Sequence, residues 1–315
     1  MDVYEHILNE FLNTPRISEW VEIQALFRRV ADGKPAHWLL PQRACEAVGG
    51  DLSGAVPALV AVACSHMGIV MVDDMLDADP RGEHLKVGEA VVANMACALQ
   101  SVALASITRC ELDEMRKLAA LESLNQMFLA TALGQHWDVH TREITEEVYW
   151  KIAKTKSSPF FGEAFHLGAL MGGASVQLAA RVRNLGFIYG EMIQIHDDLN
   201  DALEVPANPD WTGGRLPLPI LFAEMVDHPA RGRFEKLRQK AGASPKALKE
   251  AQEILIQCGA VSYCIDQLLR RYQAVRKVLS NESLLRPSSL IRLFEDVVAP
   301  VWSLFQAAGE KPFED

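Results

Sequence analysis

Two acidic motifs of the form Asp-Asp-x-x-Asp are the clearest chemical feature of the sequence. They read Asp73-Asp74-Met75-Leu76-Asp77 and Asp197-Asp198-Leu199-Asn200-Asp201. On a helix, the first and fifth positions of such a motif lie one turn apart on the same face, so two carboxylates can bind one cation. Carboxylate oxygens suit Mg²⁺, which prefers a few protein oxygens together with water and substrate phosphates. The predicted Mg²⁺ ligands, which would hold a diphosphate between two helices, are Asp73, Asp77, Asp197 and Asp201.

Each motif follows an apolar stretch with helical character, at 69–72 and at 188–195. Carboxylates at the end of a buried helix are costly unless cations compensate them, and the negative end of the helix dipole adds to that need. Two other interpretations stay open on this ground alone. One is a solvated acidic patch. The other is a di-iron carboxylate bundle, which would need two inward-facing Glu-x-x-His pairs that the sequence does not supply.

Apolar residues recur at helical spacing along the whole chain, and no run alternates with the period of two that marks a strand. The breaks between helical stretches are short, and none resembles a linker. We therefore predict an all-α fold, with ten or more helices in one domain spanning 1–315. Two stretches, 55–72 and 90–107, are apolar on nearly every face, which predicts helices at the centre of the bundle.

The net charge of −10 argues against a nucleic-acid partner, which would usually meet a basic face. Six single cysteines among apolar residues predict reduced, buried thiols and a cytoplasmic protein. The N-terminal residues carry no signal-peptide pattern. The stretch 90–107 contains polar residues and lacks basic flanks, so we expect a buried helix there and no transmembrane segment.

Several further motifs stand at characteristic distances from the two acidic ones. They are His66, seven residues before Asp73; Arg81-Gly82; Gly134-Gln135 with Asp138; Lys156-Ser157, seven residues after Tyr149; Gln194 before the second motif; and Gly214-Arg215 before Leu218-Pro219. As a set, and over residues 33–223, they resemble the trans-prenyl diphosphate synthase family of head-to-tail isoprenyltransferases.

The resemblance implies a single large bundle of the isoprenoid synthase type with a central substrate cavity, present as a homodimer. It implies a Mg²⁺-dependent condensation of an allylic prenyl diphosphate with isopentenyl diphosphate, in which three Mg²⁺ ions bind with the substrate and pyrophosphate is released. The catalytic residues implied are Asp73, Asp74, Asp77, Asp197, Asp198, Asp201 and Lys156. The substrate-binding residues implied are Lys34, His37, His66, Arg81, Ser157, Gln194 and Arg215.

The sequence departs from the family pattern on one side of the site. The family's Gly-Lys-Arg-x-Arg-Pro segment reads Gly33-Lys34-Pro35-Ala36-His37-Trp38, and its Arg-Arg-Gly is reduced to Arg81-Gly82. In the family these basic residues hold isopentenyl diphosphate. Replacing an arginine removes bidentate geometry as well as charge. The resemblance therefore implies an altered isopentenyl-diphosphate site beside an intact metal site.

Gly68 and Ile69, five and four residues before Asp73, are expected to line the pocket for the prenyl tail. Short-chain members of the family place an aromatic ring there as a floor. Without a ring, the pocket would accept a tail of about four isoprene units or more, giving products of C20 or longer. The alternative is that these small residues only permit close helix packing.

Two alternative functions remain. A class I terpene synthase or an irregular prenyltransferase would use the same allylic ionisation, but terpene synthases usually replace the second Asp-rich motif, which this chain keeps. A non-catalytic partner subunit of a heteromeric synthase would explain the lost basic residues, but it would have no use for two intact metal motifs.

Overall fold

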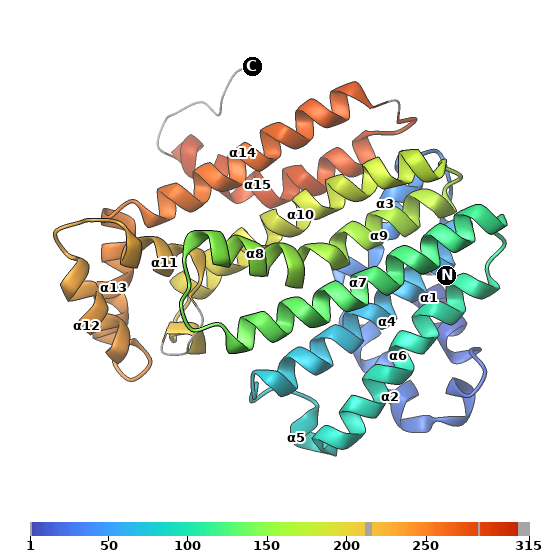
Figure 1. Ribbon diagram of the computed structural model, residues 1–315, viewed down its shortest axis with the longest axis horizontal. Helices are drawn as coiled ribbons and strands as arrows, with labels where there is room; N and C mark the ends of the chain where they lie inside the picture. The colour runs from blue at the N-terminus through green and yellow to red at the C-terminus, as the bar shows by residue number, and fades with distance from the viewer. Residues whose placement is uncertain (1, 212–215, 283, 308–315) are drawn as a thin grey trace.

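The computed structural model describes residues 2–211, 216–282 and 284–307, and all regular structure within those ranges is helical, as predicted (Figure 1). The helices, with short 3₁₀ segments marked η, are α1 (Val3–Leu12), η1 (Ile17–Glu19), α2 (Val21–Asp32), η2 (Ala36–Leu39), α3 (Leu40–Ala47), α4 (Leu52–Leu76), α5 (His84–Val87), α6 (Glu89–Arg109), α7 (Glu114–His140), α8 (Glu146–Lys156), α9 (Ser158–Met171), α10 (Val176–Leu203), η3 (Pro209–Trp211), α11 (Leu218–Met225), α12 (Arg231–Ala241), α13 (Pro245–Gln257), α14 (Ala260–Asn281) and α15 (Ser288–Ala307).

Three helices form the centre of the bundle. In α9 every residue from Ser158 to Leu170 is buried, and α9 packs against both α4 and α10 (Figure 1). The contact between α9 and α10 is close: a Cβ on Gly186 would lie 2.5 Å from the carbonyl oxygen of Phe161, which only glycine avoids. The two acidic motifs lie at the C-terminal ends of α4 and α10, so this packing holds them near each other.

Side-chain caps fix where the two motif-bearing helices begin. The Asp51 carboxylate accepts a hydrogen bond from the Gly54 N–H at 3.0 Å at the start of α4. The Ser175 hydroxyl accepts one from Leu178 N–H at 3.2 Å at the start of α10. Such caps satisfy N–H groups that have no partner within the helix. Because the start of each helix is fixed, so is the register that orients the motifs at its far end.

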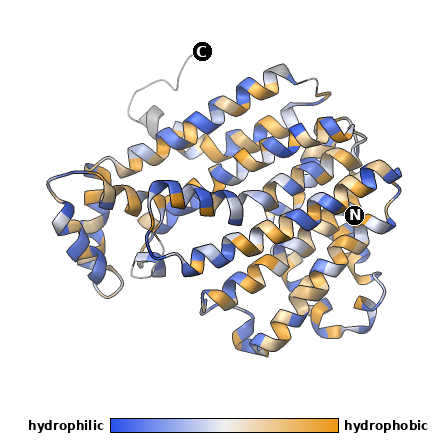
Figure 2. Ribbon diagram, viewed as in Figure 1, coloured by the Kyte–Doolittle hydropathy of each residue, from blue (hydrophilic) through white to orange (hydrophobic). Residues whose placement is uncertain are grey.

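The prediction that residues 90–107 form a central helix was half right. The stretch is helical, as α6, and Val92, Leu99 and Ile107 are buried, but Val91 and Cys97 are exposed. Figure 2 shows hydrophobic residues along both α4 and α6. Both helices are long and apolar enough to cross a membrane, yet each packs within the bundle, with 67% of the apolar stretch of α4 and 44% of that of α6 buried. An all-round apolar helix therefore does not always lie at the centre, because an exposed face can also be apolar.

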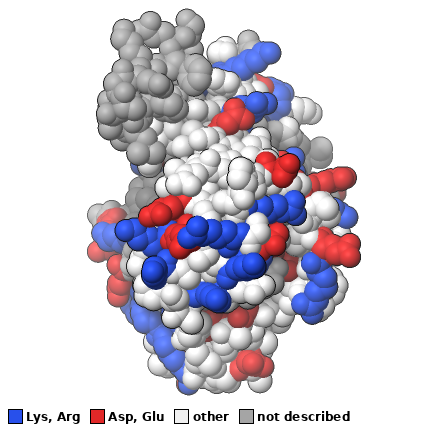
Figure 3. Space-filling view, turned by 90° about the vertical axis from the view of Figure 1, so that its left-hand side faces the viewer, with Lys and Arg blue, Asp and Glu red and all other residues white. Residues whose placement is uncertain are grey.

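A second, smaller hydrophobic cluster joins α11, α12 and α13 around Trp211 and Phe234. Leu216 packs against both this cluster and the main core. Figure 3 shows the end of the molecule formed by α12 and α13, where acidic and basic side chains are interspersed. Ion pairs such as Arg238–Glu224 fix some of these side chains. The single domain spanning 1–315 stays a prediction.

The six cysteines are free. Cys45, Cys64, Cys110 and Cys264 are buried as predicted, whereas Cys97 is exposed on α6 and Cys258 is half-buried. The sequence contains one Glu-x-x-His pair, Glu163 and His166 in α9, where a di-iron bundle would need two. The Ser123 hydroxyl lies 2.8 Å from the Glu163 carboxylate and 2.7 Å from His166 Nδ1, so this buried pair is bonded to a third side chain.

Candidate active site

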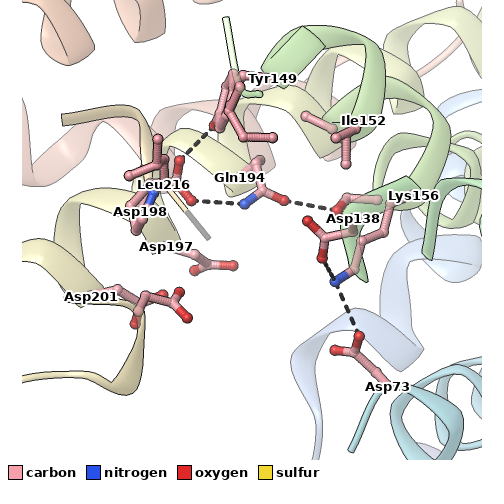
Figure 4. A pocket seen from close by; sticks show the side chains of 15 residues that line it. Asp73, Asp138, Tyr149, Ile152, Lys156, Gln194, Asp197, Asp198, Asp201 and Leu216 are labelled. Atoms are coloured by element: carbon pink, nitrogen blue, oxygen red, sulfur yellow. Dashed lines mark hydrogen bonds and ion pairs between the residues drawn. The ribbon is translucent and has the colours of Figure 1, made fainter. Parts of the chain in front are cut away.

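A polar pocket of about 280 Å³ opens between the C-terminal ends of α4 and α10 (Figure 4). Helices α7 and α8 and the segment before α11 complete its walls. Among the lining residues, the charged ones are Asp73, Asp138, Lys156, Asp197, Asp198, Asp201 and Asp210. The pocket thus combines carboxylates from both motifs with a lysine, which suits a polyanion bound together with cations.

Lys156 bridges two of the acidic walls. Its Nζ lies 2.6 Å from an Asp138 carboxylate oxygen and 3.1 Å from an Asp73 oxygen (Figure 4). The Gln135 side-chain amide also donates to Asp73. With about a fifth of its side chain exposed, Lys156 keeps its ammonium group fixed at the pocket edge. A fixed positive charge can stabilise a leaving diphosphate without reorganising during the reaction.

Gly134 permits the close approach of α7 and α8 that places Lys156. A Cβ at position 134 would lie 2.5 Å from the Lys156 Cα and would overlap the Thr155–Lys156 peptide. The neighbouring atoms are backbone, which cannot give way as a flexible side chain can.

Gly134→Ala is expected to destabilise the protein by about 1–3 kcal/mol and to lower kcat/KM by up to about 100-fold, because α8 must shift and carry Lys156 with it. Chemical denaturation and steady-state kinetics measure the two effects. Gly232→Ala is the matched control, since a Cβ there meets no atom within 4 Å. Equal stability and activity in the two variants would contradict the role given to Gly134.

The two adjacent acids of the second motif have different surroundings. Asp198 is buried, and its carboxylate accepts hydrogen bonds from Tyr149 Oη at 2.6 Å, Leu218 N–H at 2.7 Å and the Gln194 amide at 2.8 Å. Burial raises the pKa of Asp198 to about 7. Ser157 Oγ in turn donates to Gln194 at 2.8 Å. The network joins α8, α10 and the start of α11, and the catalytic role of Asp198 stays a prediction.

Asp197 and Asp201 lie one turn apart on α10 and face the pocket (Figure 4). Burial raises the pKa of Asp201 to about 6, with further contributions from Asp210 and Asp197. Within the described ranges no three His, Cys, Asp or Glu side chains lie close enough to hold a metal ion by themselves. A Mg²⁺ ion here would therefore share its ligands with water or substrate phosphate, which is its usual preference. The oxygen donors and the excess of negative charge fit that ion.

Comparison with known proteins agrees with this site. Residues 23–255 match the family model described as "Polyprenyl synthetase". The chain belongs to the polyprenyl synthetase family. It is accordingly an enzyme of the trans-prenyltransferase type, as the resemblance implied.

Two curated relatives and two solved structures illustrate the likeness. "Geranylgeranyl diphosphate synthase" of Methanosarcina mazei is 28% identical over 236 residues, covering 70% of this chain and 71% of that protein. "Short chain isoprenyl diphosphate synthase" of Methanothermobacter thermautotrophicus is 30% identical over 248 residues, covering 74% and 75%. A geranylgeranyl pyrophosphate synthase structure has a TM-score of 0.81 at 18% identity, covering 98% and 97%. That from Geoglobus acetivorans has a TM-score of 0.77 at 19% identity, covering 94% of each chain. At these identities the structures show the all-α fold alone.

The remaining acids of the first family motif lie at the edge of the site. Asp74 and Asp77 do not line the pocket, unlike Asp73. Burial raises the pKa of Asp74, and the nearby Asp79 and Asp73 carboxylates add to that effect. Asp77 is the exposed C-cap residue of α4. Their roles as catalytic residue and metal ligand stay predictions.

Two basic residues predicted to hold isopentenyl diphosphate in this polyprenyl synthetase form ion pairs at the surface. Lys34 Nζ pairs with Asp2 at 2.7 Å, and its side chain is 63% exposed. Arg81 pairs with Asp79 at 2.9 Å and is 87% exposed. Arg215, predicted to act with Lys156 on the allylic diphosphate, lies outside the described residues. The structure thus brings three of the four predicted metal ligands, Asp73, Asp197 and Asp201, to one pocket, and it pairs Lys34 and Arg81 with neighbouring carboxylates.

His37 and His66, predicted to bind the same substrate, lie close to each other. Their ring centroids are 6.2 Å apart, and Trp38 Nε1 donates to His66 Nδ1 at 3.2 Å. Burial lowers the pKa of His66 to about 4, with a smaller contribution from His37, and burial also lowers the pKa of His37. Burial therefore favours the neutral form of both imidazoles.

Gly68 and Ile69 do not line the polar pocket. A Cβ on Gly68 would lie 3.5 Å from the Ala96 carbonyl oxygen and 3.8 Å from Leu99 Cβ, both on α6. This face of α4 packs against α6, which agrees with the alternative of close helix packing. The tail pocket stays a prediction.

Sequence reasoning did not include three pocket residues among the functional ones. Asp138 pairs with Lys156, and the signal for it was the Gly134-Gln135-x-x-Asp138 pattern. Tyr149 bonds Asp198, and its signal was the spacing to Lys156. Asp210 lines the pocket from η3, and no motif in the sequence marks it.

Proposed function

We propose that this chain is a Mg²⁺-dependent prenyltransferase that ionises an allylic prenyl diphosphate and joins its prenyl chain to a π bond of a second substrate. The observation that carries the proposal is the pocket itself, where Asp197 and Asp201 face Asp73 with Lys156 at the same edge (Figure 4). Carboxylates on two walls and one fixed ammonium group suit a diphosphate bound with metal ions.

The polar residues that line the pocket have separate roles in the proposed reaction. Asp73, Asp197 and Asp201 would hold Mg²⁺, which supplies Lewis-acid stabilisation of the leaving diphosphate when bound. Lys156 contributes a fixed positive charge to the same leaving group. Ser157 and Gln194 hold the pocket wall through their hydrogen bond, and Asp198 ties that wall to Tyr149. Three Mg²⁺ ions, as the resemblance implies, are part of the proposal.

The proposed chain length is C20 or longer. The relatives include proteins named geranylgeranyl diphosphate or pyrophosphate synthases, and positions 68 and 69 of this chain carry no aromatic ring. Elongation of isopentenyl diphosphate is the reaction that the resemblance implies. Lys34 and Arg81, which would hold that substrate, form ion pairs with Asp2 and Asp79. Ionisation of the allylic donor therefore has stronger support than elongation of isopentenyl diphosphate. The cytoplasmic location stays a prediction.

The test separates binding of the donor from its chemistry. Geranylgeranyl thiolodiphosphate, in which sulfur replaces the bridging oxygen and slows ionisation, is expected to bind the full chain only when Mg²⁺ is present. Calorimetric titration with Mg²⁺ and with excess EDTA measures this. Equal binding in both conditions, or no binding in either, would overturn the proposed function.

Gly68→Phe is expected to lower the preference for geranylgeranyl over geranyl diphosphate by about 10-fold, because a ring at this position would shorten the tail pocket. Gly68→Ala is the matched control, since its Cβ makes ordinary van der Waals contacts with α6. The ratio of kcat/KM for the two donors is the measurement. An unchanged ratio in a folded Gly68→Phe protein would place the tail elsewhere.

We also propose a homodimer through α6 and α7. The neighbouring surfaces of these packed helices expose Val91 on α6 and Leu118, Leu129 and Leu133 on α7, each at least 41% exposed. An apolar face of this kind suits a subunit interface.

Sedimentation at micromolar concentration is expected to give a molecular mass of twice 34.9 kDa. Leu129→Glu should shift the protein towards the monomer, and a monomeric wild type would contradict the dimer.

A further inference from the structure

Four aromatic and imidazole rings form a cluster next to the metal side of the site. We call His37, His66, Phe160 and Phe161 the ring cluster. The His37 ring lies 5.2 Å from Phe161, edge to face, and the His66 ring lies 5.6 Å from Phe160. Phe160 and Phe161 are 5.2 Å apart. These separations are those at which aromatic rings attract one another.

None of the four rings lines the polar pocket, but two of the elements that bear them also lead to pocket residues. His66 lies two turns before Asp73 on α4, and Phe160 follows the pocket residue Ser157 by three positions at the start of α9. Burial lowers the pKa of His37, and the negative charge of Asp197 partly opposes this by raising it. His37 and His66 are each half-buried residues, so part of each residue stays accessible. An acceptor that must reach the reacting end of the donor could therefore contact them.

Hydrogen bonding makes His66 uncharged. The indole nitrogen of Trp38 can only donate, so His66 Nδ1 must accept its hydrogen bond and cannot carry a proton. The single proton of this imidazole is then on Nε2. This conclusion follows from the donor and acceptor roles, and the burial of both histidines points the same way.

The two described basic residues predicted to bind isopentenyl diphosphate have other partners. The Lys34 ammonium group pairs with Asp2 and lies 5.8 Å from the Tyr4 ring centroid. Arg81 makes two hydrogen bonds to the Asp79 carboxylate through its side chain, at 2.9 and 3.1 Å. The ring cluster itself contains no Lys or Arg. A diphosphate against these four rings would lose its hydration without gaining a counter-charge from them, which is unfavourable.

We infer that the second substrate of this enzyme is an uncharged molecule with an electron-rich aromatic ring, held against the ring cluster. The inference rests on the proposed ionisation of the allylic donor. The bond between the allylic C1 and the diphosphate oxygen breaks, and its electron pair leaves with pyrophosphate. A carbon–carbon bond forms between C1 and a ring carbon of the acceptor. The proton on that carbon passes to pyrophosphate, which restores aromaticity and balances the reaction.

The experiment compares acceptors in the full chain with Mg²⁺ and geranylgeranyl diphosphate. Indole and 4-ethylphenol are the uncharged aromatic probes, and isopentenyl diphosphate is the charged one. Pyrophosphate release and product mass are measured for each acceptor and without any. At least one aromatic probe is expected to raise pyrophosphate release by about 10-fold or more, with saturation, and to give a C-prenylated product. Isopentenyl diphosphate is expected to remain unconsumed.

Three results would overturn the inference. One is consumption of isopentenyl diphosphate with saturation at micromolar concentration. Another is pyrophosphate release that is equally fast without an acceptor, giving a hydrocarbon or an alcohol. The third is that neither aromatic probe is prenylated although geranylgeranyl thiolodiphosphate binds with Mg²⁺. Loss of that Mg²⁺-dependent binding would instead be a failure of the proposed function, so the two failures can be told apart.

A variant pair at one position gives an independent readout. His37→Arg places a guanidinium beside Phe161, whereas His37→Gln keeps the site uncharged. We expect His37→Arg to lower kcat/KM for the aromatic acceptor about 10-fold more than His37→Gln does. Thermal unfolding and thiolodiphosphate binding verify that both variants fold. If His37→Arg instead raises the use of the aromatic acceptor, the inference is wrong.

Discussion

Replacing Asp197 with alanine is expected to lower kcat/KM for prenyl transfer by at least about 10³-fold. Asp197 is exposed to the pocket on the same face of α10 as Asp201, where the proposed Mg²⁺ ions would bind. The free energy of unfolding should stay the same or rise, because Asp197 contributes to the like-charge repulsion that raises the pKa of Asp201. Asp73→Ala on the opposite wall is expected to act in the same way on activity.

Asn200→Ala is the matched control for this prediction. Asn200 lies on α10 within the same motif, is exposed and does not line the pocket. Steady-state kinetics with a geranylgeranyl diphosphate donor measure kcat/KM, and chemical denaturation measures the free energy of unfolding. Activity retained by Asp197→Ala, or wild-type activity retained in excess EDTA, would contradict the metal mechanism.

The fold class was predictable because helical periodicity is a local property of the sequence. The apolar stretch 55–72 became the buried middle of α4, as expected from a helix without a polar face. The same reasoning misplaced α6, because an apolar pattern cannot distinguish burial inside the chain from an exposed apolar face. The full burial of α9 was not foreseen either. It depends on close contacts with α3 and α10 that bring together residues distant in the sequence.

Only part of the geometry of the candidate site was predictable, because the direction of each side chain depends on tertiary contacts. Asp197 and Asp198 are chemically identical neighbours, but they point about 100° apart around a helix. Both line the pocket, but Asp197 is exposed there, whereas Asp198 is buried and accepts three hydrogen bonds. Lys34 shows the same limit, because its ion pair with Asp2 depends on how the N-terminal helix packs. Residue type and spacing identify the candidates, and tertiary contacts decide where each side chain points.

Replacing Lys156 with methionine is expected to lower kcat/KM by about 10²–10³-fold. The substitution keeps a long, unbranched side chain and removes the ammonium group that lies between Asp138 and Asp73. The leaving diphosphate would then lose a fixed positive charge, so kcat should fall along with kcat/KM. The two carboxylates would also lose their shared partner, which predicts weaker binding of geranylgeranyl thiolodiphosphate.

Lys154→Met tests whether the effect belongs to the pocket or to α8 as a whole. Lys154 is on the same helix, 55% exposed, and lies 3.8 Å from Glu191 outside the polar pocket. Surface pairs of this kind contribute little to stability, so Lys154→Met should keep kcat/KM within about twofold of the wild type. Rates of pyrophosphate release in the two variants decide between the alternatives. Equal losses in both would mean that Lys156 acts through the overall positive charge of α8, and not through its place between Asp73 and Asp138.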